Sequence, residues 1–583
     1  MMATLQHETF YRTGTWSDKT LSVYAGWTAL PGSFAEPMPL HNERDDVVLL
    51  FSGEEYSGPQ VREELRSRGH ALGPAESGYL VHLYEDNPQF VEKLNGLFHG
   101  LVVDRAQGKV TLFNDRFGMH RLYYHQSEDT FYFATEAKAI LAVRPDLRAS
   151  DPRSIGEFVA CSCVLEDRTI FRDIHVLPAA SEWTFSKGHL TSKHTYFKPT
   201  QWEEQEPLSA EAYYQDLRSH LSAALPRYFL GEQRTGIAMT GGLDTRVILA
   251  TRRPEPGSLP SYTFGSKYRD SYDVRVGRRV ARVCQQPHQV IEVGDEFLAR
   301  FGYYADRSIY LSEGTIDVYR ASDLYVSEKA RQIAPVKIVG TYGSEIVQHA
   351  VMFKPVEPQA GLFRPEFLAE VHAAADTYAA LRRQNPVTFA AFRQSPWYHR
   401  GILALEESQL TVRSPFMDND FVQAIYRCPP EMKDDVRLRL IRDGHSSLAA
   451  IRSDRGAGGN GRSISSAVTR FFREFTFKAE YAYDYGMPQP VARIDHLLHG
   501  LHLERLFLGR HKLLHFRVWY RDQLSTYVRE MLLDPRTLSR PYLERGRMET
   551  LVEDHLSGRR NNTTTIHKLL TLELIHRRFL DAQ

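Results

Sequence analysis

The sequence predicts an α/β protein in two successive parts: an antiparallel β-sandwich flanked by helices, then a doubly wound parallel sheet with a helical extension. Short runs of alternating hydrophobic and polar residues, separated by turn residues, predict the sandwich. Strand-like runs that alternate with helical stretches predict the parallel sheet. A chain of 583 residues, with 42% hydrophobic and 11% aromatic residues, is typical of folded proteins and too long for one core.

The first part contains six runs with the strand pattern: LSVYAGW (21–27), VVLLFSGEEY (47–56), LFHGLVVD (97–104), KVTLFND (109–115), RLYYHQ (121–126) and TFYFAT (130–135). A helical pattern, VREELRSRGH (61–70), interrupts them.

The boundary between the parts is expected in a polar, proline-containing stretch, residues 199–216. A helix is expected to start near Ser209, with Glu211 in its first turn. We therefore predict two domains, residues 1–205 and 206–583.

The second part alternates helices with four short strand-like runs: GIAM (236–239), SYTF (261–264), HQVIEV (288–293) and VKIVG (336–340). After about residue 395 the pattern is nearly all helical and ends in LLTLELIHRRFL.

Charge and cysteine usage narrow the class of protein. Lys plus Arg and Asp plus Glu each number 72, so no overall field draws the chain to nucleic acid or to an anionic membrane. Four scattered cysteines favour neither a disulfide framework nor a thiolate zinc site. No stretch approaches the roughly 20 apolar residues that a membrane span needs, and the N-terminal residues lack the apolar core of a signal peptide. We expect a cytoplasmic protein.

The stretch TGGLDT (240–245) follows a strand-like run and precedes a helical one. Gly241 and Gly242 would let the backbone approach a ligand closely, and the helix N-terminus would offer N–H groups to an anion. Hydroxyls of Thr240 and Thr245 add donors, and Asp244 would hold a magnesium ion that bridges phosphate oxygens. An ordinary strand–turn–helix junction is the alternative.

This loop resembles the pyrophosphatase-type loop of ligases that cleave ATP to AMP and pyrophosphate, with threonines in place of two serines. Collinear segments extend the resemblance to the asparagine synthetase family: LNGLFHGLVVD (94–104), LFNDRFGMHRLYY (112–124), FATEAKAIL (133–141), TIFRDIHVLPAA (169–180) and QLTVRSPFMDNDFV (409–422). The resemblance implies an Ntn-hydrolase-like first domain of the class II glutamine amidotransferase type. It implies an adenine nucleotide alpha hydrolase-like second domain.

The first domain departs from the pattern of family members that hydrolyse glutamine. Their nucleophile is an N-terminal cysteine, whereas the first cysteine here is Cys161. A family Asn-Gly-Glu appears as Ser52-Gly53-Glu54, and an acidic pair appears as Glu76-Ser77-Gly78. No arginine occurs in GWTALPGSFAEPM, where the family's substrate arginine would lie. We expect this domain to make no ammonia and to be structural or a docking surface.

In the second domain the resemblance implies an adenine contact at Phe264 and Gly265, although a plain strand end would look the same. Asp270 and Asp273 follow at the family's acidic position, or begin a solvated helix. A family lysine that stabilises the intermediate has Arg452 and Arg455 near its place, and the resemblance implies the catalytic role at Arg455.

The segment VKIVGTYGSEIV (336–347) aligns with a further family motif. The resemblance implies a nucleotide contact at Gly340 and a magnesium ligand and catalytic role at Glu345. Tyr342 stands where asparagine synthetases have an acid, as in the ring-closing β-lactam and carbapenam synthetases, in which this tyrosine deprotonates the attacking amine. A free phenol has a pKa near 10 and needs an oriented partner to act as a base.

Three side chains, His399, Glu406 and Glu407, are candidates for that partner. The alternative for Tyr342 is the aromatic wall of a pocket.

These features predict an AMP-forming carbon–nitrogen ligase that uses ATP and Mg²⁺ to adenylate a carboxylate and transfers it to an amine. The expected partners are a small-molecule or peptide carboxylate, including a sugar acid, and an amine donor. An asparagine synthase that uses ammonia or a partner glutaminase is one alternative, and a non-catalytic scaffold is another. A homodimer stays open.

Overall fold

The fold is described from a computed structural model, in which residues 1–57, 59–73, 76–432, 436–453, 471, 475–481, 483 and 508–581 are described. None of the helices within these ranges is both long enough and apolar enough to cross a bilayer.

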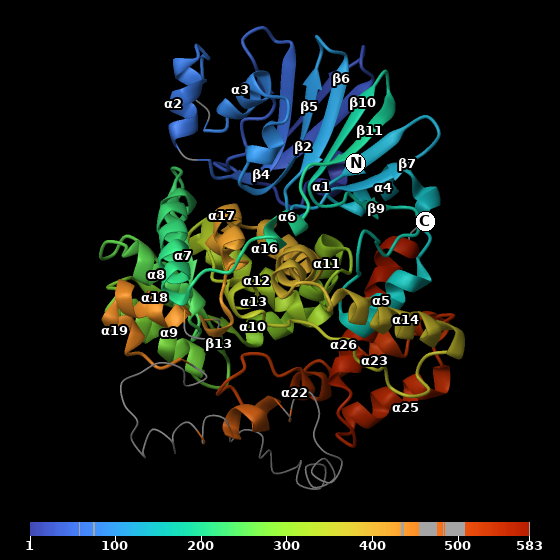
Figure 1. Ribbon diagram of the computed structural model, residues 1–583. Helices are drawn as coiled ribbons and strands as arrows, with labels where there is room; N and C mark the ends of the chain where they lie inside the picture. Colours follow the sequence, from blue (N-terminus) through green and yellow to red (C-terminus); the bar gives the residue numbers. More distant parts are fainter. Residues whose placement is uncertain are drawn as a thin grey trace.

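The first part is built from three antiparallel sheets, which lie at the top of Figure 1. A six-stranded sheet has the order β11-β10-β6-β5-β4-β3, beside a hairpin β1-β2 and a three-stranded sheet β8-β7-β9. The strands are β1 (Arg12–Asp18), β2 (Val23–Ala29), β3 (Leu40–His41), β4 (Val47–Glu55), β5 (Gly96–Asp104), β6 (Lys109–Asn114), β7 (Tyr123–Gln126), β8 (Phe131–Ala134), β9 (His175–Val176), β10 (Ser181–Ser186) and β11 (His189–Thr195).

Strand alternation gives the large sheet two apolar faces. Val48, Leu50 and Leu101 pack toward the hairpin and the small sheet, which form the second layer of a sandwich. Leu49 and Phe51 point to the opposite face, which α3 covers. The helices of this part are α1 (Met2–Leu5), α2 (Pro59–Ser67), α3 (Tyr79–Asp86), α4 (Ala137–Val143), α5 (Pro152–Cys161) and α6 (Thr200–Glu203).

The second part is centred on a parallel sheet with the order β14-β13-β12-β15-β16. Its strands are β12 (Thr235–Ala238), β13 (Ser261–Ser266), β14 (His288–Val293), β15 (Val336–Ile338) and β16 (Thr411–Arg413). The chain runs outward from β12 to β14 and returns to β15 on the other side of β12. In such sheets, ligands bind beyond the carboxyl ends of the strands at this reversal.

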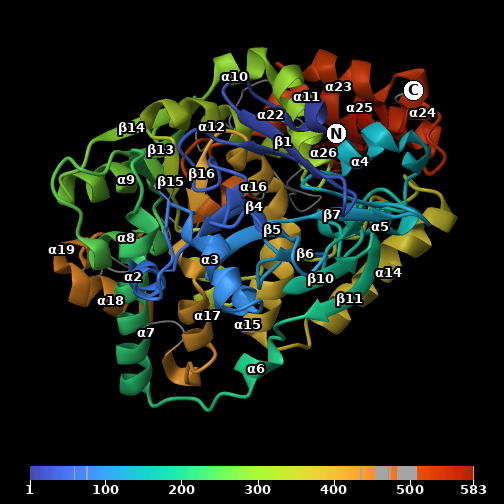
Figure 2. The same cartoon turned by 90° about the horizontal axis from the view of Figure 1, so that it is seen from above.

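Helices cover both faces of the parallel sheet, as the view from above shows (Figure 2). They are α7 (Ala210–Ala224), α8 (Asp244–Arg252), α9 (Tyr272–Val283), α10 (Asp295–Ala299), α11 (Phe301–Ser312), α12 (Ala321–Ile333) and α13 (Gly343–Gln348). The helix α7 begins at the expected place because the Ser209 hydroxyl caps it by accepting from the N–H of Ala212.

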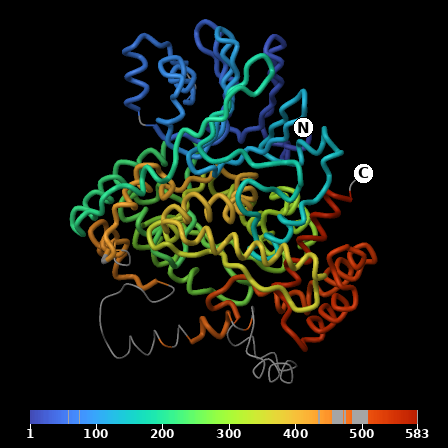
Figure 3. The backbone as a smooth tube through the Cα atoms, turned by 45° about the vertical axis from the view of Figure 1, so that its right-hand side comes forward, coloured from blue at the N-terminus to red at the C-terminus, as the bar shows by residue number. Residues whose placement is uncertain are grey.

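A helical extension follows and forms the yellow to red part of Figure 3. Its helices are α14 (Pro365–Leu381), α15 (Pro386–Phe389), α16 (Arg400–Glu407), α17 (Asn419–Ile425), α18 (Val436–Gly444), α19 (Ser446–Ala449), α22 (Phe516–Arg521), α23 (Ser525–Leu532), α24 (Pro535–Leu538), α25 (Arg545–Leu556) and α26 (Thr563–Ile575). Two π-helical segments are η5 (Ala390–His399) and η10 (His576–Leu580).

The short 3₁₀ helices are η1 (Phe90–Lys93), η2 (Pro145–Leu147), η3 (Leu225–Phe229), η4 (Val318–Arg320), η6 (Pro415–Met417) and η7 (Pro430–Met432).

The expected fold class is confirmed, with antiparallel sheets before residue 196 and a parallel sheet after residue 234. The expectation of a nearly helical chain after residue 395 needs one correction, because β16 adds a fifth parallel strand there. Three residues are too short to carry a periodic signal.

The two parts share their apolar interior. One core cluster joins Phe158 and Val164 of the first part to Tyr304 and Leu569 of the second. Another cluster joins Phe98 to Ile338 in the parallel sheet.

Candidate active site

The loop between β12 and α8 is held by its own polar groups. The N–H of Gly241 donates to Asp273 Oδ1 (2.8 Å), and the N–H of Gly242 donates to Thr240 Oγ1 (3.2 Å). The Thr245 hydroxyl donates back to the Ala238 carbonyl (3.3 Å). No described side chain caps the N-terminus of α8, so its first turn is available to an anion.

Two glycines bring the end of β15 against the start of α8. A Cβ atom on Gly340 would lie 2.8 Å from the backbone nitrogen of Thr245. A Cβ atom on Gly343 would lie 2.7 Å from the carboxyl carbon of Asp244. Only residues without a side chain permit this approach, which joins the two loops at the reversal of the sheet.

Asp244 is the centre of a small polar network. Its Oδ1 accepts from the Arg437 guanidinium (2.5 Å), and its Oδ2 accepts from the Ser344 hydroxyl (2.7 Å). Arg437 also donates to Ser344 Oγ (2.9 Å). Burial raises the pKa of the Asp244 carboxyl, Arg437 opposes that shift, and the negative charge of Glu345 adds to it.

Arg437 and Arg246 are site residues that sequence reasoning missed. The Nε of Arg437 is buried and finds no hydrogen-bond acceptor among the described residues. Arg246 braces the loop by donating to the carbonyls of Gly241 (2.8 Å) and Ile451 (2.6 Å). The basic run VRLRLIR around Arg437 was the available signal, but nothing in it shows which arginine turns inward.

Tyr342 lies in the loop between β15 and α13 with a φ of 77°, a left-handed conformation that is strained for an aromatic residue. Its side chain is 1% exposed, and its hydroxyl has no hydrogen-bond partner among the described residues. Burial raises the pKa of this phenol well above its usual value, and the charges of Glu407, Glu406 and Glu345 raise it further.

Of the three expected partners of Tyr342, His399 makes the direct ring contact, edge to face with the centroids 5.0 Å apart. Its Nε2 lies 3.4 Å from Glu345 Oε1. Glu406 pairs with Lys337 (2.8 Å), and Glu407 pairs with Arg400 (2.7 Å).

Phe264 and Gly265 end β13, next to β12. A Cβ atom on Gly265 would lie 2.7 Å from a methyl carbon of Val290 on β14, so packing between strands explains this glycine. Phe264 packs against the core, with the Lys337 ammonium 5.8 Å from its ring centroid. The plain strand end therefore accounts for both residues without a ligand.

The other acidic and basic residues that were expected at the site lie in different places. Asp273 joins the β12–α8 loop, as described above, whereas Asp270 pairs with Arg278 on the surface. Arg452 offers its carbonyl to Arg246 (3.5 Å). Arg455 lies outside the described residues.

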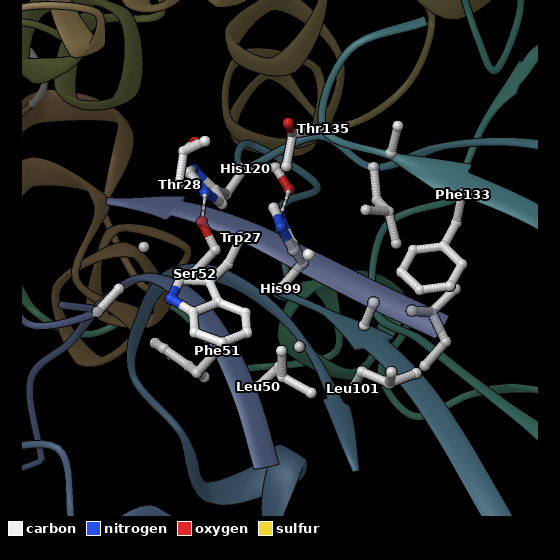
Figure 4. A pocket seen from close by; sticks show the side chains of 18 of the residues that line it. Trp27, Thr28, Leu50, Phe51, Ser52, His99, Leu101, His120, Phe133 and Thr135 are labelled. Atoms are coloured by element: carbon white, nitrogen blue, oxygen red, sulfur yellow. Dashed lines mark hydrogen bonds between the residues drawn. The ribbon is translucent and has the colours of Figure 1, made fainter. Parts of the chain in front are cut away.

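A cavity of about 1260 Å³ opens between the sandwich layers and extends to α16 and β16. Figure 4 shows Ser52, His99 and His120 above the apolar side chains of Trp27 and Leu50. Ser52 Oγ lies 3.0 Å from His120 Nε2, and the two imidazole rings stack with centroids 4.6 Å apart. Burial lowers the pKa of His120 to about 3, so this pair is neutral.

Glu54, which stands where the resemblance implied a contact with glutamine, has a partner within this chain. Glu54 forms a buried ion pair with Arg413 of β16 (2.5 Å), which also donates to the Leu230 carbonyl. None of the four cysteines, all within the described part, lines the cavity. Burial raises the pKa of the Cys161 thiol to about 12, so that thiol is a poor nucleophile.

Comparison with known proteins agrees with the resemblance. Residues 1–197 match the family model of the glutamine amidotransferase domain. Asparagine synthetases 1 and 3 of Bacillus subtilis (strain 168), both named as glutamine-hydrolysing, are 25% identical over 252 residues and 28% identical over 243 residues. A probable asparagine synthetase of Schizosaccharomyces pombe (strain 972 / ATCC 24843), also named as glutamine-hydrolysing, is 24% identical over 435 residues.

Coverage differs among these relatives. The matches span 42% and 40% of this chain and only 38% and 39% of the two Bacillus proteins. The match to the Schizosaccharomyces protein spans 70% of this chain and 68% of that one.

The fold and the loop at the sheet reversal define a two-part α/β protein with an amidotransferase-type first part. The chain is similar to asparagine synthetases, at 24–28% identity over 40–70% of its length.

Proposed function

We propose that this chain is an ATP-dependent amide-forming ligase that adenylates a carboxylate, releases AMP and pyrophosphate, and transfers the acyl group to an amine. We propose further that it has no glutaminase activity and acts on a specialised metabolite, a peptide or a sugar acid. The observation that carries the proposal is the convergence of the β12–α8 loop, Ser344 and Arg437 on Asp244.

ATP fits this convergence because the donors suit phosphate and the glycines leave room for backbone contact. The pyrophosphate portion would be held by the first turn of α8, by the hydroxyls of Thr240 and Thr245, and by the free Nε of Arg437. Stabilising that leaving group favours attack of the carboxylate on the α-phosphate.

Magnesium fits the donor set of Asp244 and Glu345, because burial and then repulsion from the negative charge of the buried Glu345 raise the pKa of the Asp244 carboxyl. A cation beside them would relieve this repulsion. When bound, magnesium would neutralise charge on the phosphate oxygens.

We assign the deprotonation of the amine to Tyr342, with His399 positioning its ring. The buried, unpartnered hydroxyl of Tyr342 supports this role, as does the contact of His399 with both Tyr342 and Glu345. Because the phenol holds its proton in the resting protein, it needs a proton acceptor or a bound substrate to act as a base.

The loss of glutaminase activity is supported by the chemistry of the cavity. No cysteine lines it, and Glu54 is committed to Arg413. Among the polar residues that line it, Ser52 and the two neutral histidines are hydrogen-bonded to one another.

The direct test is release of pyrophosphate from Mg²⁺-ATP across a panel of carboxylates and amines, with glutamine hydrolysis measured in parallel. We expect a substrate-dependent release that falls at least about 100-fold in Asp244→Ala. Asp270→Ala, the same change in a surface acid, is the control and should retain wild-type release. Equal pyrophosphate release by the two variants would contradict the proposed ATP site. Hydrolysis of glutamine would contradict the proposed lack of glutaminase activity.

A second candidate is an asparagine synthase that uses ammonia or a partner glutaminase. The cavity of the first part favours this candidate, because its lining reaches the loop that holds Tyr342. Ser414 lines the cavity, and its hydroxyl donates to the carbonyl of Thr341, the residue before Tyr342 (2.7 Å). Aspartate with ammonia would then give the fastest pyrophosphate release in the panel.

We also propose a domain boundary, a cellular location and an assembly for the protein. We place the domain boundary between residues 205 and 206, in the segment that links α6 to α7. We propose a cytoplasmic protein and keep a homodimer as its candidate assembly.

A further inference from the structure

Two histidines and two glutamates meet at the edge of the first domain, far in sequence from Asp244. Glu43 lies in the turn between β3 and β4, and His70 follows α2. His82 and Glu85 lie three residues apart on α3, so they share one face of that helix. Figure 1 shows α2 and α3 side by side at the upper left.

Each of the four side chains offers one atom to a common point, and these atoms all lie within 4.8 Å of one another. His82 Nδ1 is 2.9 Å from Glu85 Oε2 and 3.6 Å from Glu43 Oε2. His70 Nδ1 is 3.7 Å from Glu85 Oε2. Both histidines therefore turn Nδ1 toward the same carboxylate oxygen, Glu85 Oε2.

Three of these side chains are oriented from behind by a second group. His70 Nε2 lies 2.9 Å from Asp86 Oδ1, while Glu43 Oε1 accepts from the Ala71 N–H and Glu85 Oε1 from the Asn42 amide, both at 2.8 Å. The Asp86 contact places the His70 proton on Nε2 and leaves the lone pair of Nδ1 facing inward. A carboxylate behind a histidine in this way is a common feature of metal-ligating histidines.

The donor set distinguishes among cations. Two imidazole nitrogens with two carboxylate oxygens suit zinc and similar transition metals, whereas calcium and magnesium prefer oxygen ligands alone. Tetrahedral zinc places its ligand atoms about 3.3 Å apart, so atoms that now lie up to 4.8 Å apart would close by at most about 1.5 Å. Glu43, whose side chain is 42% exposed, has the freedom to move inward.

We propose that Glu43, His70, His82 and Glu85 form a binding site for a zinc-class divalent cation that ties α2 and α3 to the β3–β4 turn. With four protein ligands the site is closed and structural rather than catalytic. It does not depend on the proposed ligase activity.

The test uses the full-length chain with any affinity tag removed, freed of metal by a chelator and then titrated with zinc chloride. We expect one equivalent of zinc per chain, a higher melting temperature, and visible absorption typical of tetrahedral cobalt when cobalt chloride replaces zinc. His70→Ala should lose this zinc equivalent, whereas His194→Ala, which removes an exposed histidine of the same domain (53%), should retain it.

A second variant separates binding from folding. Asp86→Asn keeps all four ligands and should weaken zinc affinity by about 10- to 100-fold. Circular dichroism of the metal-free variants should match that of the metal-free wild type. Wild-type chain that binds no zinc, or His70→Ala that binds it with unchanged affinity, would overturn the proposal.

Discussion

Tyr342 is the single residue whose surroundings bear most directly on the chemistry. It occupies a strained backbone position, its hydroxyl is buried, and carboxylates surround it. An aromatic wall would need none of these features together, because a phenylalanine would fill the same space without burying a hydroxyl.

Tyr342→Phe removes only that hydroxyl. If it is the base, we expect the rate of amide formation to fall by about 100-fold or more, while ATP-dependent stabilisation is unchanged. Single-turnover product formation and thermal shifts with Mg²⁺-ATP measure the two effects. Unchanged product formation would identify Tyr342 as a pocket wall.

His120 makes stability depend on pH. Its pKa is lowered to about 3 in the folded chain, so between that value and the ordinary 6.5 the unfolded chain binds the extra proton. Because of this residue, the free energy of unfolding is highest above pH 6.5 and decreases as the pH falls. The decrease is about 2 kcal/mol between pH 7 and pH 5.

The melting temperature of His120→Gln should therefore fall less steeply on acidification than that of the wild type. His194→Gln, in an exposed position, should keep the wild-type slope. Parallel slopes for all three proteins would show that His120 is not buried as a neutral side chain.

At the scale of elements, the contact between the end of β15 and the first turn of α8 depends on Gly340. Gly340→Ala would place a methyl group 2.8 Å from a backbone nitrogen. We expect this overpacking to cost about 1–3 kcal/mol and to abolish pyrophosphate release.

Gly546→Ala is the matched control, because a Cβ atom there meets nothing within 4 Å. In the first turn of α25, alanine should leave stability unchanged or raise it by up to about 1 kcal/mol. Thermal unfolding and the pyrophosphate assay compare the two variants; similar behaviour would contradict the close approach.

The elements were largely predictable because their signals are local. The short apolar runs in residues 47–56 and 97–104 identify β4 and β5, and Ser209 marks the start of α7. Long-range contacts carry no such signal. Arg437 reaches Asp244 across 193 positions, and Arg413 reaches Glu54 across 359. The loop 240–245 could thus be found from sequence, but its arginine could not.

For the whole molecule, the decisive question is whether the chain is an enzyme or a scaffold. An enzyme of the proposed kind should be stabilised by Mg²⁺-ATP, by about 2.7 kcal/mol at 100 times the dissociation constant. We expect a rise of several degrees in the melting temperature that EDTA removes and that Asp244→Ala does not show. A chain that ATP and magnesium leave unchanged would be the non-catalytic descendant.

The interior shared by the two parts has a consequence for how such a chain can change over time. Phe158 and Leu569 belong to one apolar cluster. Dividing the gene between the two parts would therefore expose a large apolar surface on each fragment. The first domain is therefore expected to stay with the second whether or not it has a reaction of its own. Its apolar side chains complete a core that the second domain needs in order to stay folded.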